Sequence, residues 1–489
     1  MPRLVAIAPW GALLLLACSS DGLSHPAPDD LGVAPLVVPD LAGDPCHDGV
    51  VDGDETATDC GGSCAGCANG QACHIDGDCQ SAQCIGGLCA DWPTCTDGVK
   101  NEDESDVDCG GHCPRCAVGA ACLAGDDCTT LHCRQGRCIV PPAVKLSLAA
   151  PVFTSLGHDV YDVAIGDFNG DGKQDAVLVG GPGLAFLRGR GDGTFLDPVV
   201  LTQLGGTLAA TDLDGDGLSD LVFGDIGFVY VMYGQRPGLR PPMAVAIAGQ
   251  ADAIAVGDVN GDHRPDIAYA ATNKKDGGVV LATAARAYQE GPSFPGFLDY
   301  LHGLGVGDLD GDGKADVLTA DLMHPPTVYA GGAKGALPLL WMNAPLDTSG
   351  FPALTLGHFD GDRRPDVVMT SFNYDASQCY RGDGKGGLRP AVAVVHVKGA
   401  PLTAVTADFD GDGWDDVAIL ENSDANSRGG VRVVRGHNDC TFAEQIDTRL
   451  GGLVEDLAVG DLNGDGYPDL VAALRMGQQG YSVILNTTH

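Results

Sequence analysis

One nine-residue pattern occurs seven times in the C-terminal two-thirds of the chain, and it restricts the possible folds more than any other feature. The first copy is Asp167-Phe-Asn-Gly-Asp-Gly-Lys-Gln-Asp175, and the copies begin at positions 167, 212, 258, 308, 358, 408 and 461. Short apolar runs flank each copy, as Val163–Ile165 and Ala176–Val179 flank the first. A repeat of 45 to 53 residues that holds several short strands is typical of one propeller blade. The pattern therefore predicts an all-β, seven-bladed β-propeller.

The residue types in the pattern predict a bound cation. Carboxylates or amides stand at positions 1, 3, 5 and 9, and glycine stands at position 4 of all seven copies and at position 6 of five. Ca²⁺ takes six to eight oxygen ligands at about 2.4 Å. A chain can surround it only by turning tightly, which residues without a Cβ permit. We expect position 7 to add a backbone carbonyl, and we expect about five to seven calcium sites.

The expected ligands follow the same positions in every loop. They are Asp167, Asn169, Asp171, Lys173 and Asp175; Asp212, Asp214, Asp216, Leu218 and Asp220; Asp258, Asn260, Asp262 and Asp266; Asp308, Asp310, Asp312, Lys314 and Asp316; Asp360, Asp362 and Asp366; Asp408, Asp410, Asp412, Trp414 and Asp416; and Asp461, Asn463, Asp465, Tyr467 and Asp469.

Two loops depart from the pattern. The third has His263 at position 6, and the fifth has His358 at position 1 and Arg363 at position 6. An imidazole is a poor ligand for a hard cation. We expect a serviceable third site, a weak or empty fifth site, and full sites elsewhere.

Two alternatives apply to these loops. An EF-hand needs a bidentate Glu at position 12 and flanking helices. Position 12 is occupied here by Leu178, Phe223, Tyr269, Thr319, Met369, Ile419 and Ala472, which excludes the EF-hand. Asp- and Gly-rich turns without metal remain the second alternative.

The spacing, ligand pattern and copy number of the loops resemble the FG-GAP repeats, also called VCBS-type repeats, of integrin α-subunit propellers and related bacterial and fungal proteins. The resemblance covers residues 143–489. It implies calcium in loops on one face of the propeller, with ligand recognition usually on the other face.

The ring is expected to close by pairing its two ends. The last repeat stops after Val483–Asn486, where its third strand should end, so its fourth strand is missing. Residues 150–155 precede Asp167 as residues 195–200 precede Asp212. They would supply that strand and leave no open edge.

A cysteine-rich module precedes the propeller and is an internal duplication. Successive gaps of 14, 4, 3, 6, 6, 5 and 5 residues occur in both copies, at 46–89 and at 95–138. A unit this short needs cross-links to fold, so we predict a small, loop-rich, disulfide-rich module over 46–140, with a pairing that spacing leaves open. The Cys-x-x-Cys at Cys64 and Cys113 is compatible with zinc, but export to an oxidising compartment favours disulfides. The pattern resembles disulfide-rich repeats of myxobacterial surface proteins.

The N-terminus predicts export and lipid anchoring. Arg3 precedes an apolar stretch that ends Leu15-Leu16-Ala17-Cys18 and resembles the lipobox of bacterial lipoproteins, with Cys18 as the lipidated residue. An ordinary signal peptide is the alternative. We expect residues 1–18 to be the signal, residues 19–45 to be a flexible linker, and the mature chain to be an outer-membrane or cell-surface lipoprotein whose only membrane attachment is the lipid.

The remaining sequence favours a binding protein. The formal net charge of −38 argues against a nucleic-acid partner, and neither a Gly-x-Ser-x-Gly nor a His-Glu-x-x-His motif occurs. We expect a non-enzymatic adhesion module for a glycan or for an envelope or extracellular protein; the alternatives are a polysaccharide-active enzyme and a structural spacer. Candidate recognition segments are 299–302, 371–375 and 421–428, and Cys379 and Cys440 are a possible further pair.

Overall fold

The computed structural model describes residue 51, short stretches between residues 57 and 139, and residues 145–488 except 272–275, 296–300, 322–325, 343–352, 361–363, 372–375, 390–392, 397–399, 423–428 and 438. The chain forms two compact units, residues 1–92 and 93–489. The division falls between the two cysteine repeats. The predicted signal, Cys18 and the predicted linker lie outside the described residues.

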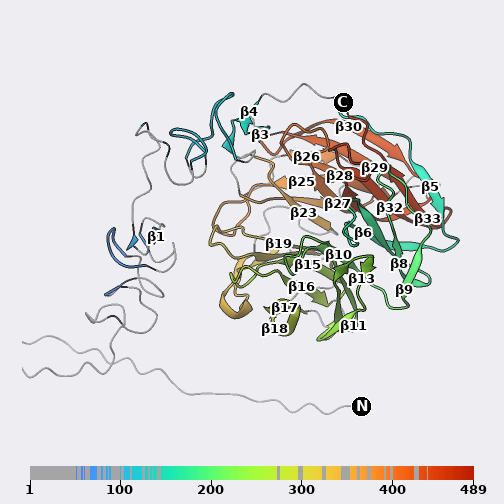
Figure 1. The fold of residues 1–489 in the computed structure, drawn as a ribbon, viewed down its shortest axis with the longest axis horizontal. Coiled ribbons are helices and arrows are strands. Elements are labelled where there is room, and N and C mark those ends of the chain that lie inside the picture. The colour runs from blue at the N-terminus through green and yellow to red at the C-terminus, as the bar shows by residue number, and fades with distance from the viewer. Residues whose placement is uncertain are drawn as a thin grey trace, which may run out of the picture. The chain divides into compact units, whose positions relative to one another are not determined.

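The second unit contains a seven-bladed β-propeller, as the repeat predicts (Figure 1). Blades 1 to 3 are formed by β6 (Val160–Gly166), β7 (Asp175–Gly180), β8 (Gly183–Leu187) and β9 (Val199–Thr202); β10 (Leu208–Thr211), β11 (Asp220–Met232) and β14 (Met243–Gln250); and β15 (Ala253–Gly257), β16 (Asp266–Ala271), β17 (Asp276–Ala284) and β18 (Ala287–Pro295). In blade 2, β11 takes the place of two strands, because its first part pairs with β10 and its last part with β14.

Blades 4 to 7 repeat the four-stranded antiparallel meander. They are β19 (Leu301–Gly307), β20 (Asp316–Asp321), β21 (Thr327–Tyr329) and β22 (Leu339–Met342); β23 (Ala353–Gly357), β24 (Asp366–Ser371), β25 (Ala376–Tyr380) and β26 (Ala393–His396); β27 (Ala400–Ala407), β28 (Asp416–Asn422), β29 (Gly430–Gly436) and β30 (Phe442–Arg449); and β31 (Leu453–Gly460), β32 (Asp469–Arg475), β33 (Gly480–Ile484) and β5 (Val152–Ser155).

One small hairpin and one turn complete the named elements of the propeller. The hairpin β12 (Gly234–Gln235) and β13 (Gly238–Leu239) follows β11, and a 3-10 turn, η4, spans Ala333–Gly335. No α-helix occurs among the residues that the structure describes. Accordingly, that part of the chain holds no helix with the length and apolarity to cross a membrane.

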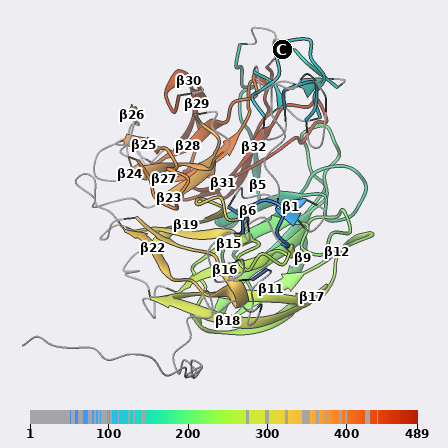
Figure 2. The same cartoon turned by 90° about the vertical axis from the view of Figure 1, so that its left-hand side faces the viewer.

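The ring closes through strand β5, as predicted from the missing fourth strand. β5 pairs with β33, with Val152 opposite Val483 and Ser155 opposite Gly480. The first and last segments of the ring therefore share one sheet (Figure 1). The innermost strands β6, β10, β15, β19, β23, β27 and β31 neighbour one another in that order, and β31 returns to β6. Figure 2 shows β19, β23 and β27 side by side.

The hydrophobic core of the propeller is divided among the seams between blades. Seven buried clusters lie one at each seam, including the seam between blades 7 and 1. The second strands are buried along nearly their whole length, as in β16 and β32. A strand covered on both faces needs a continuous apolar run, which explains the runs that follow each loop. The stability of the fold therefore depends on holding neighbouring blades together.

The described cysteines form disulfides, and the two copies of the repeat pair in the same way. The bonds are Cys60–Cys67 and Cys79–Cys89 in one copy, and Cys109–Cys116 and Cys128–Cys138 in the other. The first copy has the hairpin β1 (Cys84–Ile85) and β2 (Leu88–Cys89), and the second has β3 (Cys133–Arg134) and β4 (Arg137–Cys138).

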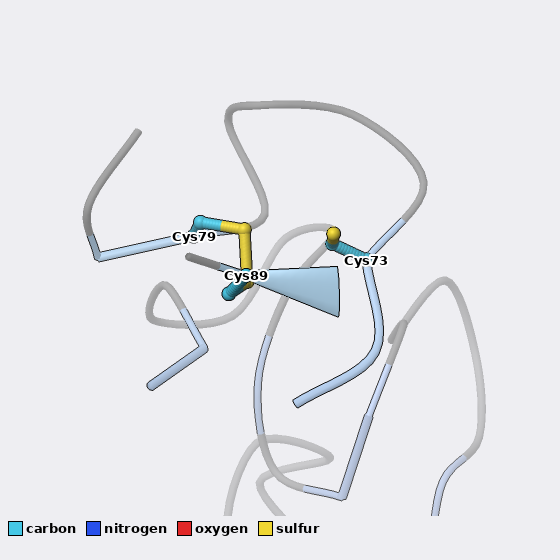
Figure 3. A group of neighbouring side chains, drawn as sticks. All are labelled: Cys73, Cys79 and Cys89. Carbon is cyan, nitrogen blue, oxygen red and sulfur yellow. A yellow bond between two sulfur atoms is a disulfide. The ribbon is translucent and has the colours of Figure 1, made fainter. Parts of the chain in front are cut away.

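The sulfur atoms of Cys73, Cys79 and Cys89 lie close together, as they would in a metal site. Figure 3 shows why they are not one: the sulfurs of Cys79 and Cys89 are bonded to each other beside Cys73, which is also disulfide-bonded. A disulfide sulfur is not a thiolate ligand. For the described cysteines, the disulfide interpretation is therefore favoured over zinc.

Candidate metal centres

All seven nine-residue loops occupy the same place in their blades. Position 1 follows the innermost strand, and position 9 is the first residue of the second strand, as β6 ends at Gly166 and β7 begins at Asp175. The loops therefore line one face of the propeller. Because the chain direction is the same in every innermost strand, the starts of these strands lie at the opposite face.

The position-9 aspartate is fully buried in every loop. Asp175, Asp220, Asp266, Asp316, Asp366, Asp416 and Asp469 are all 0% exposed. In the fourth loop, Asp316 accepts the N–H of Leu309 at position 2 and the N–H of Gly331 after the third strand, both at 2.9 Å. The carboxylate therefore ties the loop to two strands of its own blade, a role that the nine-residue pattern alone does not reveal.

The position-1 aspartate lies within a ring of backbone N–H groups. In the first loop, Asp167 accepts hydrogen bonds from Gly170, Asp171 and Gly172, at 2.7, 3.2 and 2.9 Å. Equivalent bonds occur in the second, third, fourth and seventh loops. In the third loop His263 has a φ of 63° and still donates its N–H to Asp258. The third loop therefore keeps the turn despite lacking glycine at position 6.

Positions 3, 5 and 7 continue the turn. Asp310 at position 3 accepts the N–H of Asp312 at 3.0 Å, and Asp312 at position 5 accepts the N–H of Lys314 at 2.8 Å. The same position-5 bond is made by Leu218, Trp414 and Tyr467, and by Lys173 in the first loop. Asn260 and Asn463 at position 3 accept in the same way as Asp310.

The carboxylates of three loops converge on one point. In the second, fourth and sixth loops, one oxygen from each of positions 1, 3 and 9 lies within 4.8 Å of the other two; the residues are Asp212, Asp214 and Asp220; Asp308, Asp310 and Asp316; and Asp408, Asp410 and Asp416. Oxygens on opposite sides of a calcium ion stand about 4.8 Å apart. The donor set is all oxygen and anionic, so these loops fit the ion that the pattern predicts. The first, third and seventh loops have an amide at position 3 instead.

Buried position-9 aspartates have raised pKa values. Burial raises the pKa of Asp175, Asp220, Asp266, Asp316 and Asp469 to about 6, with nearby carboxylates of the same loop adding to the effect. Burial raises the pKa of Asp416 to about 8. A divalent ion among these groups would offset the repulsion.

Basic side chains already offset part of this charge. Arg435 contacts Asp410 and lies 2.7 Å from Asp412 in the sixth loop. Arg286, from the hairpin between β17 and β18 in blade 3, contacts Asp214 and lies 3.0 Å from Asp216 in the second loop. The sequence analysis did not identify either arginine. The only sequence signal for either arginine is the Arg435-Gly436 dipeptide at the end of a strand.

The loops also join neighbouring blades. The carbonyl at position 2 accepts a hydrogen bond from the following blade: Gly386 donates to Leu309 at 3.2 Å, and Gly193 donates to Leu462 at 3.1 Å. In the sixth loop, the side chain of Asn486 donates to Phe409 at 2.6 Å. An ordered loop therefore supports the seam between its own blade and the next one.

A cavity of about 510 Å³ lies at the starts of the innermost strands, on the face opposite the loops. Its lining includes Tyr161, Thr207, Thr403, Asp162 and Asp456. The carboxyls of Asp162 in blade 1 and Asp456 in blade 7 are hydrogen-bonded to each other. They also accept the N–H groups of Leu208 and Val163, each at 3.2 Å. Burial and the neighbouring carboxyl raise the pKa of Asp162, and burial raises the pKa of Asp456 to about 6.

Parts of the predicted sites lie outside the described residues. These are Asp362 in the fifth loop, residues 299 and 300, residues 372–375 and residues 423–428. For the other predicted ligands, the structure brings the members of each loop together within one turn. Whether each binds a metal stays a prediction.

Four segments match the family model of the FG-GAP-like repeat, at residues 167–223, 212–269, 358–419 and 408–472. The propeller carries FG-GAP-like repeats. The matched segments contain every loop except the fourth. This agrees with the resemblance drawn from the spacing and composition of the loops.

Three solved structures with similar folds are distant in sequence. BBS1N, crystallised with ARL6DN, is 14% identical, with a TM-score of 0.50 over 70% of this chain and 98% of that one. A lectin from Agrocybe aegerita that specifically recognises non-reducing terminal N-acetylglucosamine is 18% identical, with a TM-score of 0.45 over 59% of this chain and 80% of that one. The WD40 β-propeller of Doa1 is 10% identical, with a TM-score of 0.48 over 70% and 97%. At these identities the BBS1N likeness supports the propeller fold and nothing about a ligand.

Proposed function

We propose that this chain is a calcium-binding propeller, held on the cell envelope by a lipid at Cys18, that acts as a non-enzymatic binding or adhesion module for a glycan or a protein. Calcium is assigned to the loops whose oxygen donors converge, and it would supply positive charge that holds each turn closed. The FG-GAP-like repeats and the propeller fold are compatible with a binding module. The face opposite the loops would carry the recognition site.

The cavity at the starts of the innermost strands is the observation that supports this site. It combines the ring of Tyr161 with the hydroxyls of Thr207 and Thr403 and with carboxyl groups. Hydroxyls and carboxyls hydrogen-bond to polar ligands, and an aromatic ring offers an apolar face. The cavity is formed by strands of a rigid ring, so it is preformed.

Binding of the calcium-loaded, lipid-free chain to a glycan array and to envelope proteins tests the proposal. Tyr161→Ala should weaken binding at least tenfold, and Phe228→Ala, which removes an exposed ring from blade 2, should leave binding unchanged. Equal loss in the two variants, or a ligand bound with full affinity by both, would place the site elsewhere.

A second function is favoured by one observation in the same cavity. The carboxyls of Asp162 and Asp456 are hydrogen-bonded to each other and the pKa of each is raised, as in carboxyl pairs that share one proton and serve as acid and base. If the chain cleaves a polysaccharide, Asp456→Asn should abolish turnover while leaving binding intact. Binding without turnover in the wild type would exclude this second function.

A further inference from the structure

The fifth loop lacks the group that organises the other six. Its position 1 is His358, whose backbone N–H donates to the Asp415 carboxylate of blade 6 at 2.7 Å. The Nδ1 atom of the His358 ring lies 3.8 Å from the same carboxylate, and the side chain is 57% exposed. The imidazole therefore faces the next blade.

The described residues of this loop do not fit calcium. Asp360 at position 3 has its Oδ2 atom 3.5 Å from the Nε atom of Arg381, but Asp410 of the sixth loop contacts Arg435 in the same way, so this contact does not set the fifth loop apart. The difference lies at position 1: with an imidazole there, the fifth loop has oxygen side chains at three of the four ligand positions, whereas each of its six relatives has them at all four, and a hard cation favours oxygen ligands. The position-9 aspartate, Asp366, still makes its two structural hydrogen bonds, to the N–H groups of Phe359 and Gly382.

A disulfide lies at the seam that this loop should support. Cys379 in β25 of blade 5 is bonded to Cys440 of blade 6, with a Cα–Cα distance of 5.9 Å, and both residues are 0% exposed. They are the only cysteines after Cys138. In blades 1, 3 and 6, the register position of Cys379 is occupied by apolar residues, namely Phe186, Val279 and Val433.

The disulfide lies beside the hydrogen bond that joins the fifth loop to blade 6. The N–H of Cys440 donates to the carbonyl of Phe359, position 2 of the fifth loop, at 2.7 Å. In other loops this bond comes from a residue such as Gly193 or Gly386, and it relies on the loop being held in place. Here the donor residue itself is covalently joined to blade 5. Cys379, Cys440 and Phe359 belong to one buried cluster at this seam.

We propose that the Cys379–Cys440 disulfide takes the place of the metal ion at the fifth loop. The seam between blades 5 and 6 is then held by a covalent bond that depends on an oxidising compartment, whereas the seams after the other loops depend on calcium. The inference rests on the proposed binding of calcium by the other loops, and it is independent of the ligand of the cavity because it concerns only the stability of the ring.

Calcium stoichiometry is the first test. The lipid-free chain, stripped with chelator and reloaded, should bind the same number of ions in the wild type and in Asp360→Ala, which removes an oxygen ligand at position 3 of the fifth loop. The matched variant Asp410→Ala, altered at the same position of the sixth loop, should bind one ion fewer. Loss of an ion in Asp360→Ala would overturn the proposal.

A rescue experiment is the second test. Replacement of the disulfide by Cys379→Val and Cys440→Ala should lower the melting temperature by a similar amount in calcium and in chelator, because no ion at this loop is released. Adding His358→Asp and Arg363→Gly should restore the loss in calcium but not in chelator, with one more ion bound. A disulfide-free variant that melts like the wild type would contradict the proposal. If the rescued variant does not fold, the stoichiometry of Asp360→Ala still decides the question.

Discussion

Asn486 provides a clean test of the idea that loops and blades are joined by a few buried hydrogen bonds. Its side chain is 1% exposed and carries no charge. The Nδ2 group donates to the carbonyl of Phe409 at 2.6 Å, and Oδ1 accepts the N–H of Thr488 at 3.0 Å. The residue thus connects blade 7 to the sixth loop. Because Thr488 is 0% exposed, water cannot replace the lost bond to its N–H.

Asn486→Ala leaves a carbonyl and an N–H without their partners inside the protein. Each buried polar group left unsatisfied costs about 1–3 kcal/mol, so the free energy of unfolding should fall by roughly 2–6 kcal/mol. Urea unfolding followed by tryptophan fluorescence and circular dichroism measures this loss. The matched control is Gln479→Ala, which removes an exposed 3.1 Å hydrogen bond to Asp159 and should cost less than about 1 kcal/mol. If the two variants lose the same free energy, the reasoning about this buried connection is wrong.

Three further predictions follow from the charges of the ring. Excess chelator should lower the melting temperature of the whole chain, because an ion bound only by the folded state stabilises it; a scanning calorimetry trace unchanged by chelator would count against bound calcium. Arg435→Gln should cost about 1–3 kcal/mol in chelator and less in calcium, since the guanidinium and the ion offset the same carboxylates; urea titrations in both conditions check this, and equal losses would contradict it. Asp162→Asn should be more stable than the wild type at pH 8 and equal to it near pH 4. The raised pKa means that the wild-type carboxyl contributes stability below its unfolded-state pKa and loses it as pH rises through the folded-state value. A gain that does not change with pH would refute this assignment.

The blade number, the loop positions and the ring closure could be predicted from the sequence because each depends on local, repeated chemistry. A tight turn needs glycine at position 4, and a strand buried on both faces needs an apolar run. The pairing of β5 with β33 followed from counting the strands in the last repeat. Each of these features follows from the residues of one repeat or from comparing repeats along the chain.

The parts that could not be predicted depend on contacts between blades. Arg286 reaches the second loop from blade 3, and Asp162 meets Asp456 across the closing seam. Neither contact can be predicted from the spacing of its residues in the sequence. The cross-link between Cys379 and Cys440 was only a possibility until the register placed their Cα atoms 5.9 Å apart.

Calorimetric titration of the chelator-stripped, lipid-free chain with CaCl₂ tests the central claim most directly. The account predicts saturable binding of one ion for each loop except the fifth, with a matching rise in melting temperature. Absence of any binding heat at every concentration, with an unchanged melting temperature, would mean that these acidic turns hold the propeller together without metal.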